Sequence, residues 1–223
     1  MGALDAKMLT MTRRYHQAGV KTDSEIREIL AAQGKSASVI SGNLLWEPEE
    51  ITKQDGTPYK VFTPFYRRGC LNAQPPRIPL AAPALDHAPI ISHNALPLEA
   101  LRLLNGADWQ KNITKDWDMS EKGGHARLQA FAAAPSNDGI NDYVDGRNFP
   151  ARTNVSRLSP YLRFGQISAH QAWHEAGKNK SPEDKQLDIF RSELGWREFS
   201  YSLLHFTNLL LAKFIFFAGW IHF

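Results

Sequence analysis

Apolar and charged residues alternate at helical spacing in residues 23–33. The pattern predicts an amphipathic helix whose N-cap is Asp23 or Ser24 and which stops at Gly34. The side chains expected to face inward are those of Ile26, Ile29 and Leu30.

A strand and a buried segment are predicted after this helix. Residues 38–40 indicate a short strand, and residues 44–48 an apolar segment that ends at a proline. A parallel sheet needs repeated strand–crossover–strand units. Only one clear strand is visible in the N-terminal part of the sequence. We therefore expect this part to form only a portion of such a sheet.

Two helix starts are predicted in the second half of the chain. Ser159 is the expected N-cap of one helix, with Pro160 in its first turn. Ser181 is the expected N-cap of a long helix over residues 183–206, which has acidic residues in its first turn. In the first of these stretches, the apolar side chains expected to be buried are those of Leu162, Phe164, Ile167, Ala172 and Trp173.

The long helix carries a group of polar and aromatic residues. Phe190, Glu193 and Arg197 are spaced i, i+3, i+7 and therefore share one face, with Trp196 at its edge. A carboxylate, an indole and a guanidinium on one side of a helix suit a planar ligand with hydrogen-bonding edges. The alternative is a surface ion pair between Glu193 and Arg197, worth roughly 0.3–0.5 kcal/mol, beside a core tryptophan.

Composition narrows the classes of protein. The 223 residues are 43% hydrophobic and carry 26 basic and 23 acidic side chains, a net charge of +3. This balance excludes a chain coated in positive charge, so any nucleic-acid surface must be local. The single cysteine, Cys70, excludes an internal disulfide and indicates a reducing compartment, with the thiol as buried filler. No secretory signal is visible at the start, so we expect a cytoplasmic protein.

Prolines mark a boundary in the middle of the chain. Six of the thirteen prolines fall within residues 75–97, where no periodic pattern is found. We therefore divide the chain into an α/β part at residues 1–74, a linker at 75–108 and a helical part at 109–223.

Residues 141–173 are dense in side chains that can bind a phosphate. Tyr143, Ser156, Arg157 and Ser159 can all donate hydrogen bonds, and Arg157 adds a fixed positive fork suited to a pyrophosphate. The exposed N–H groups of a helix start would add to such a site. From spacing alone, a capped helix start without a ligand explains the same residues.

The order of residues in this stretch resembles the flavin-binding signature of the DNA photolyase/cryptochrome family. Val155 departs from it, because the family commonly has threonine there; Thr153 is a candidate replacement. A second string in the same register, Glu-Leu-x-Trp-Arg-Glu-Phe, begins at Glu193. The matching positions of the first string are Tyr143, Arg147, Pro150, 156–159, 160–162 and 164–168.

The resemblance implies an α/β remnant followed by the first part of an all-α FAD-binding domain. Residues 13–15, 42–48 and 56–66 resemble the second half of the family's N-terminal α/β domain. FAD would be bound non-covalently. The residues implied to bind it are Tyr143, Val155, Ser156, Arg157, Leu158, Ser159, Phe190, Glu193 and Arg197.

The resemblance also implies a reaction and a partner. Light-driven electron transfer from the flavin would split a cyclobutane pyrimidine dimer flipped out of UV-damaged DNA. Glu193 and Trp196 would line the lesion pocket as catalytic residues and, with Arg197, contact the DNA. One alternative is a cryptochrome-type blue-light photoreceptor without repair activity, and another is a helical interaction module without a cofactor. No stable protein partner is predicted.

Three further expectations concern the ends of the chain and other ligands. An antenna chromophore such as a folate occurs in relatives, but His16 stands where some folate-binding relatives have a carboxylate, and the first strand–helix units are absent. We interpret the chain as truncated at both ends, its apolar tail as aberrant, and the fragment as inactive alone. A membrane anchor over 203–221 is a minority alternative. No metal site is predicted, although His170 and His174 are four apart on one helix.

Overall fold

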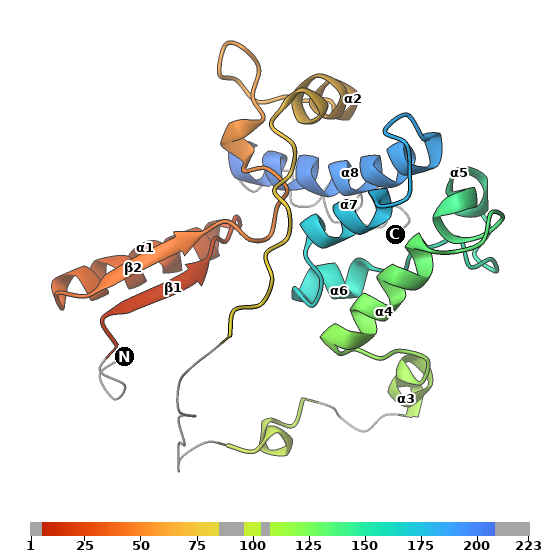
Figure 1. The fold of residues 1–223 in the computed structure, drawn as a ribbon. Coiled ribbons are helices and arrows are strands. Elements are labelled where there is room, and N and C mark those ends of the chain that lie inside the picture. The colour runs from red at the N-terminus through yellow and green to blue at the C-terminus, as the bar shows by residue number, and fades with distance from the viewer. Residues whose placement is uncertain (1–5, 85–95, 104–107, 208–223) are drawn as a thin grey trace.

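The computed structural model describes residues 6–84, 96–103 and 108–207. At the front, β1 (Met8–Thr12) and β2 (Ser36–Ile40) pair in parallel, in register from Met8 with Ser36 to Thr12 with Ile40. Helix α1 (Gln17–Ala32) connects them, and the three elements form one βαβ unit (Figure 1). The strand predicted at 38–40 is confirmed. The prediction of a lone strand is wrong, because the weakly alternating sequence of β1 conceals its partner.

Helix α1 begins earlier than the pattern predicts. Its N-cap is His16, and Asp23 lies inside the helix, buried, where its Oδ1 accepts a hydrogen bond of 2.9 Å from Arg14 Nε. The Asp23 and Ser24 caps are therefore wrong, since the Arg14 charge holds Asp23 inward. Ile29 is 58% exposed, contrary to expectation, whereas Leu30 is buried. The left-handed backbone at Gly34, with φ of 67°, confirms the predicted stop.

After β2 the chain passes through short helical segments that pack against the helical part. The segment 44–46 is buried, as predicted. Cys70 is buried too, and burial raises the pKa of its thiol, in agreement with a filler role. The short elements are η2 (Pro48–Glu50), α2 (Phe62–Pro64), the π-helix η3 (Phe65–Gly69) and η4 (Cys70–Asn72).

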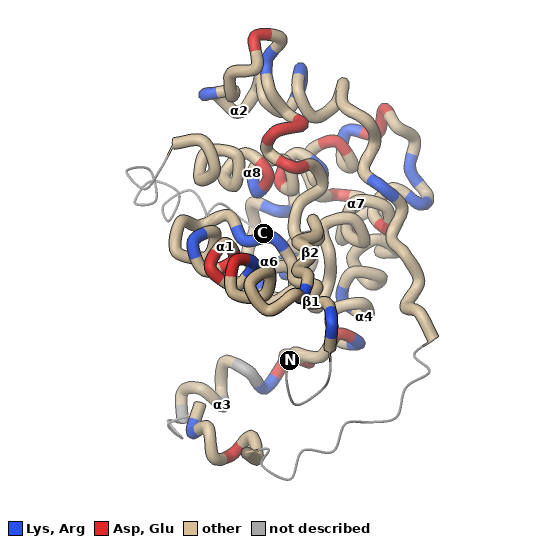
Figure 2. The backbone as a smooth tube through the Cα atoms, turned by 90° about the vertical axis from the view of Figure 1, so that its left-hand side faces the viewer, with Lys and Arg blue, Asp and Glu red and all other residues tan. Residues whose placement is uncertain are grey.

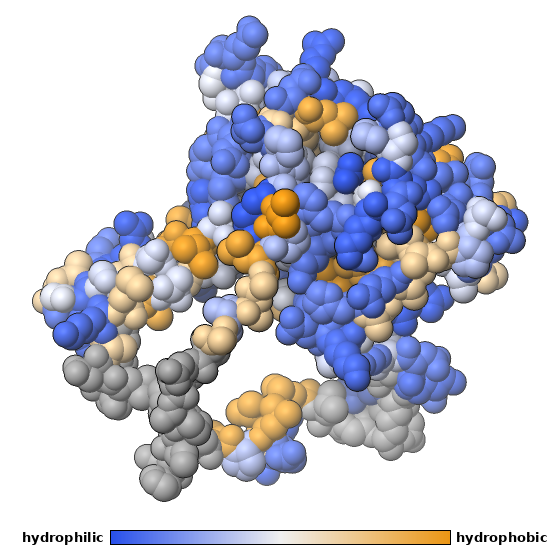
Figure 3. All heavy atoms as spheres, in the orientation of Figure 1, coloured by the Kyte–Doolittle hydropathy of each residue, from blue (hydrophilic) through white to orange (hydrophobic). Residues whose placement is uncertain are grey.

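The proline-rich segment has no regular structure over its described residues 75–84. It runs between the βαβ unit and the helices (Figure 1), and His174 Nε2 lies 2.9 Å from the carbonyl oxygen of Pro76. Residues 96–103, which include η5 (Leu98–Leu101), carry exposed leucines on the face drawn in Figure 3. The division into domains stays a prediction.

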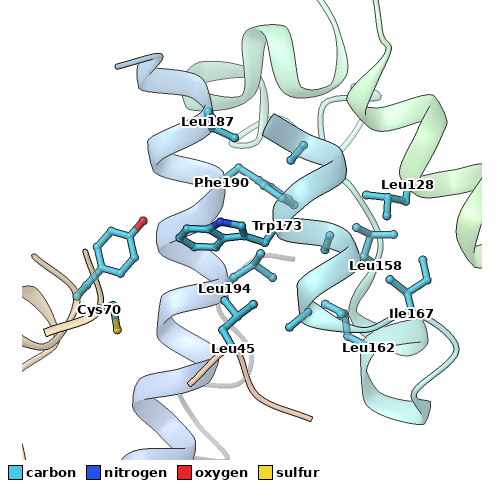
Figure 4. Packing of buried hydrophobic residues seen from close by; sticks show 14 of the residues in the cluster. Leu45, Cys70, Leu128, Leu158, Leu162, Ile167, Trp173, Leu187, Phe190 and Leu194 are labelled. Carbon is cyan, nitrogen blue, oxygen red and sulfur yellow. The ribbon is translucent and has the colours of Figure 1, made fainter. Parts of the chain in front are cut away.

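Helices enclose the hydrophobic core of the second half. Figure 4 shows Trp173 of α7 and Leu194 of α8 between these two helices, with Leu128 of α4 on the side of α7 that faces α4. Acidic and basic residues both occur along α1 and α8 (Figure 2), as the balanced composition indicates. The helices are α3 (Asp108–Thr114), α4 (Glu121–Ala132), η6 (Gly139–Asp142), α5 (Tyr143–Gly146), α6 (Ser159–Phe164), α7 (Ala169–Gly177) and α8 (Lys185–Thr207).

The helical stretch after Ser159 is two helices rather than one. Gly165, with φ of 74°, ends α6, and Ser168 begins α7 with a reciprocal capping box to Gln171. Phe164 precedes the break and is 76% exposed, which contradicts its predicted burial. Ser159 is the first helical residue and its side chain makes no capping bond, so its predicted cap role is wrong. Leu162, Ile167, Ala172 and Trp173 are buried, as predicted.

The long helix α8 confirms the predicted helix with a different cap. The Oδ1 of Asp184 accepts hydrogen bonds from the N–H groups of Gln186 (2.8 Å) and Leu187 (3.1 Å). Ser181 belongs to the preceding turn and was wrongly predicted as the cap. Asp184 caps instead because its carboxylate reaches the second and third N–H groups of the helix.

Metal and membrane sites were also considered. Within the described residues, no three His, Cys, Asp or Glu side chains are arranged to hold a metal ion. None of the described helices is both long and apolar enough to cross a membrane. Most of the segment considered as an anchor, 208–221, lies outside the described residues.

Candidate functional site

Glu193 is a buried carboxylate at the contact between α5 and α8. Its side chain is only 5% exposed, and its Oε1 accepts a hydrogen bond from Arg147 Nη1. Its second oxygen, Oε2, is buried and has no hydrogen-bond partner among the described residues. A buried oxygen without a donor costs about 1–3 kcal/mol. This atom is therefore suited to accept a hydrogen bond from a ligand.

Aromatic rings surround the Arg147–Glu193 pair. The ring centroids of Phe131, Tyr143 and Phe190 lie 5.0–5.6 Å from one another, and all three side chains are buried. The Arg147 guanidinium lies 5.5 Å from the centre of the Tyr143 ring. Burial raises the pKa of Tyr143 to about 12, so its hydroxyl keeps its proton at neutral pH. Tyr143 and Phe190 thus hold the wall of the site.

Ser156 contributes a second unsatisfied polar atom. Its side chain is buried, and its Oγ has no partner among the described residues. Half-buried Val155 precedes it and offers no hydroxyl, while the Thr153 hydroxyl donates to Asp138 over 2.5 Å. Thr153 is therefore committed elsewhere and does not replace the missing threonine. All three residues line a hollow of about 410 Å³ beside α4.

The charges around this hollow argue against a phosphate inside it. Asp116, Asp118 and Asp138 line it, with Arg127 as the one basic side chain among its lining residues. Local hydrogen bonds, chiefly from Ser120 and Thr153, lower the pKa values of Asp118 and Asp138 and keep both ionised. A phosphate bound by Ser156 is therefore expected outside this hollow, where the exposed Arg157 follows it in the chain.

Arg157 is exposed and has a left-handed backbone with φ of 54°. This conformation costs a non-glycine residue roughly 1–2 kcal/mol. Its neighbour Leu158 is buried in the core and fixes the chain at this point, so the arginine side chain is directed outward. Ser159 follows and is also exposed. Strain at an exposed arginine beside an unsatisfied hydroxyl is typical of a binding site.

Trp196 is half-buried and lies in an aromatic stack. Its indole is parallel to the ring of Phe62, with centroids 3.7 Å apart and an angle of 12° between the planes. Phe199 meets the indole edge-on at 6.0 Å. One face of Trp196 is thus covered by the segment that follows β2, here called the front segment.

Arg197 and Glu198 connect α8 to the segment after β2. Arg197 Nη2 donates to Asn43 Oδ1, and Arg197 Nη1 donates to Glu198 Oε1 over 3.1 Å. Glu198 is fully buried, and its Oε2 accepts the N–H groups of Leu45 (2.8 Å) and Trp46 (3.3 Å). Burial raises the pKa of Glu198 to about 7, although Arg197 and the two N–H groups oppose the shift.

The structure separates residues that the helical spacing grouped together. Glu193 contacts α5, whereas Arg197 contacts Asn43 and Glu198, so the predicted convergence of these side chains is wrong. Their Cα atoms differ by about 6 Å along the helix axis, far enough for each to meet a different neighbour. The alternative of a surface ion pair between Glu193 and Arg197 is also wrong.

Three side chains of the site were not assigned from the sequence. Arg147 belongs to the matched signature, and its position four residues after Tyr143 could have indicated that the two share a face. Phe62 and Glu198 offer no such signal, because their partners are distant in sequence. The sequence alone gives Glu198 no assigned role, and its burial is seen in the structure.

A second hollow lies between the start of α1 and the end of α8. Its volume is about 1080 Å³, and Arg13, Arg14, His16 and His205 are among its lining residues. The Tyr15 hydroxyl beside it donates to Glu47 over 2.7 Å. His16 is exposed at the N-terminal end of α1. The hollow coincides with the region considered for an antenna, whose presence stays a prediction.

The sequence of the chain is similar to those of photolyases and cryptochromes. A family model described as DNA photolyase matches residues 1–85. The chain is 34% identical over 208 residues to a deoxyribodipyrimidine photo-lyase from Agrobacterium fabrum, covering 92% of this chain and 42% of that protein. Cryptochrome-1 of Arabidopsis thaliana is 25% identical over 207 residues, covering 87% of this chain and 29% of that protein.

The fold agrees with a solved structure. A bacterial class III photolyase from Agrobacterium tumefaciens superposes with a TM-score of 0.81 at 33% identity, covering 92% of this chain and 42% of that one. The chain thus spans about two fifths of the length of the photolyases that it matches.

Proposed function

Because the chain belongs to the DNA photolyase/cryptochrome family, we propose that it serves in light-driven repair of UV-damaged DNA. In this proposal it binds the phosphates of a non-covalent FAD and forms one wall of a pocket for a flipped-out pyrimidine dimer. The reaction class is the splitting of the two carbon–carbon bonds that join the pyrimidines. The predicted cytoplasmic location is part of the same proposal.

The residues around Ser156 fit the phosphates of FAD. The buried Ser156 hydroxyl lacks a partner among the described residues, and the exposed Arg157 provides a charged donor beside it. Ser159 adds a second hydroxyl, and buried Leu158 holds the backbone between them. Charged hydrogen bonds to a phosphate are roughly twice as strong as neutral ones. When bound, reduced FAD supplies the light-absorbing electron donor, and these residues hold it in place.

The unpartnered Oε2 of Glu193 is the observation that carries the proposal. A pyrimidine has polar N–H groups at its edge, and a buried carboxylate that lacks one donor can accept such a group. Arg147 fixes the other oxygen, so the free oxygen has a defined direction. The Glu193 side chain is only 5% exposed, and this burial strengthens a hydrogen bond from the base to its free oxygen.

Trp196 and Arg197 have different roles in the proposed DNA-binding surface. The half-buried indole provides a flat apolar surface for the damaged base. The Arg197 guanidinium is bound to Asn43 and Glu198, so its contribution is to hold α8 on the front segment unless DNA displaces it. Phosphate contacts would supply most of the affinity.

The test is a comparison of damaged and undamaged DNA. Trp196→Ala should weaken binding of a duplex with one cyclobutane dimer by about 1–3 kcal/mol, and leave binding of the undamaged duplex unchanged. The chain alone, reconstituted with FAD, reduced and illuminated, should leave the dimer content at that of a dark control, because we expect the fragment to be inactive alone; light-dependent loss of dimers would contradict that expectation. Equal affinity of wild type and Trp196→Ala for the damaged duplex would contradict the assignment of Trp196.

A blue-light photoreceptor without repair activity is the second candidate. The similarity to a plant cryptochrome favours it, and the phosphate-binding residues would be the same. Glu193 separates the two candidates, since a receptor that signals without repair has no use for a base acceptor in the pocket. Flavin binding with no preference for damaged DNA would support the receptor.

A further inference from the structure

Three aromatic rings from two distant segments lie nearly parallel. Phe62 stacks on Trp196 at 12°, and Tyr66 is inclined by 11° to Phe62 with centroids 5.7 Å apart. Phe199 closes the edge of the stack, 6.0 Å from both Phe62 and Trp196. The front segment supplies Phe62 and Tyr66, whereas α8 supplies Trp196 and Phe199.

The stack is fixed at its base. Tyr66 is buried, and its ring packs against Gly195, where an added Cβ would lie 2.6 Å from Tyr66 Cδ2. A larger residue at 195 would push the tyrosine away from α8. This close approach sets the height of η3 on α8, and therefore the position of Phe62 above the indole.

Phe62 decides which face of Trp196 can receive a ligand. An indole has two faces, and the phenyl ring of Phe62 stacks on one of them with a centroid distance of 3.7 Å. The opposite face has no aromatic contact among the described residues, and Trp196 is only half-buried. A base that stacks on Trp196 would therefore use the face opposite Phe62.

We propose that Phe62 is a positioning residue for Trp196, which clamps the indole plane from the front segment and so orients its open face toward a flipped pyrimidine dimer. The inference rests on the proposed function. A dimerised pyrimidine has lost the double bond of its ring and packs through van der Waals contact, which requires a surface held at a fixed angle. A loose indole would pay rotamer entropy on every binding event.

Phe62→Leu is the informative change, because it removes the flat ring and keeps an apolar side chain. Affinity is measured by fluorescence anisotropy with a duplex that holds one cyclobutane thymine dimer and with the same duplex undamaged. The ratio of the two affinities should fall about 5-fold in Phe62→Leu. Phe62→Tyr should restore it, since the ring is retained. The part of the near-ultraviolet circular dichroism that Trp196→Ala removes should weaken in the leucine variant and be retained in the tyrosine variant.

Phe164→Leu is the matched control, because Phe164 is 76% exposed and lies on α6. It should change neither the ratio nor the dichroism. An unchanged ratio in Phe62→Leu, while Trp196→Ala lowers it, overturns the positioning role and leaves the proposed function intact. A higher ratio also overturns it, since Phe62 would then obstruct the base. If Trp196→Ala has no effect or the wild type does not prefer the dimer, the proposed function fails, and this inference fails with it.

Discussion

Arg147 donates a hydrogen bond to Glu193 across the contact between α5 and α8, and the carboxylate is almost completely buried. The two residues are 46 positions apart in the chain. The pair neutralises a charge that would otherwise be costly to bury, and it leaves one carboxylate oxygen available. Stability and ligand recognition therefore depend on the same contact.

Arg147→Ala should destabilise the fold by about 3 kcal/mol, because it leaves the Glu193 charge buried without a partner. The measurement is urea unfolding followed by far-ultraviolet circular dichroism. Arg152→Ala is the control, since that side chain is 52% exposed and its ion pair with Asp142 is 3.7 Å long. The control should lose no more than about 0.5 kcal/mol. Similar losses in both variants would refute a stabilising role for the buried pair.

Glu193→Gln keeps the shape of the side chain and removes its charge. We expect retention of FAD to be unchanged, and the preference for the dimer-containing duplex to fall by roughly 1.5–3 kcal/mol, the worth of a hydrogen bond to a charged group. Retention is read from the absorbance ratio of flavin to protein after gel filtration, and preference from anisotropy. Loss of flavin with preserved dimer preference would reverse our assignment of Glu193.

Replacement of Arg157 by glycine should raise stability and weaken flavin binding. Arg157→Gly relieves the left-handed strain at φ of 54° and should raise the free energy of unfolding by up to about 1 kcal/mol. Both Arg157→Gly and Arg157→Ala should weaken FAD retention, because the charge is gone. Ser168→Ala, which removes a helix cap, should cost about 1 kcal/mol of stability and retain FAD better than either. Equal FAD occupancy in Arg157→Ala and Ser168→Ala would show that Arg157 does not bind the phosphates.

Glu198 should make stability depend on pH. Its pKa rises from 4.5 to about 7 on burial, so the folded state prefers the protonated form. This contribution is present in full below pH 4.5 and is lost as the pH rises through 7, on the order of 3 kcal/mol.

The comparison of wild type with Glu198→Gln isolates this effect. Buried His170, whose pKa burial lowers to about 4, works in the other direction and is common to both proteins. Urea unfolding at several pH values should show a smaller decline in stability above pH 5 in the glutamine variant. Parallel curves for the two proteins would mean that the two backbone N–H groups keep Glu198 ionised.

Local patterns in the sequence were sufficient for much of the helical framework. Burial of Leu162, Ile167 and Trp173, the long helix and the turn at Gly34 all follow from the period of apolar residues and from backbone preferences. These depend on residues close in the chain. The caps were less accurate: α1 begins after His16 and α6 after Leu158, neither of which makes a side-chain capping bond, whereas Asp184 caps α8 in place of Ser181.

The ordered residues from Tyr143 to Ser168 also indicated the family, in agreement with a photo-lyase relative that matches 92% of the chain. Sequence could not establish which partners the site residues have. Arg147 with Glu193, Phe62 with Trp196 and Glu198 with Leu45 are all contacts between distant segments. Spacing shows which residues share a helix face but not which segment packs on that face. The packing partner of each residue depends on where along α8 each distant segment crosses the helix. That position is set by core packing, including the close approach of Tyr66 to Gly195.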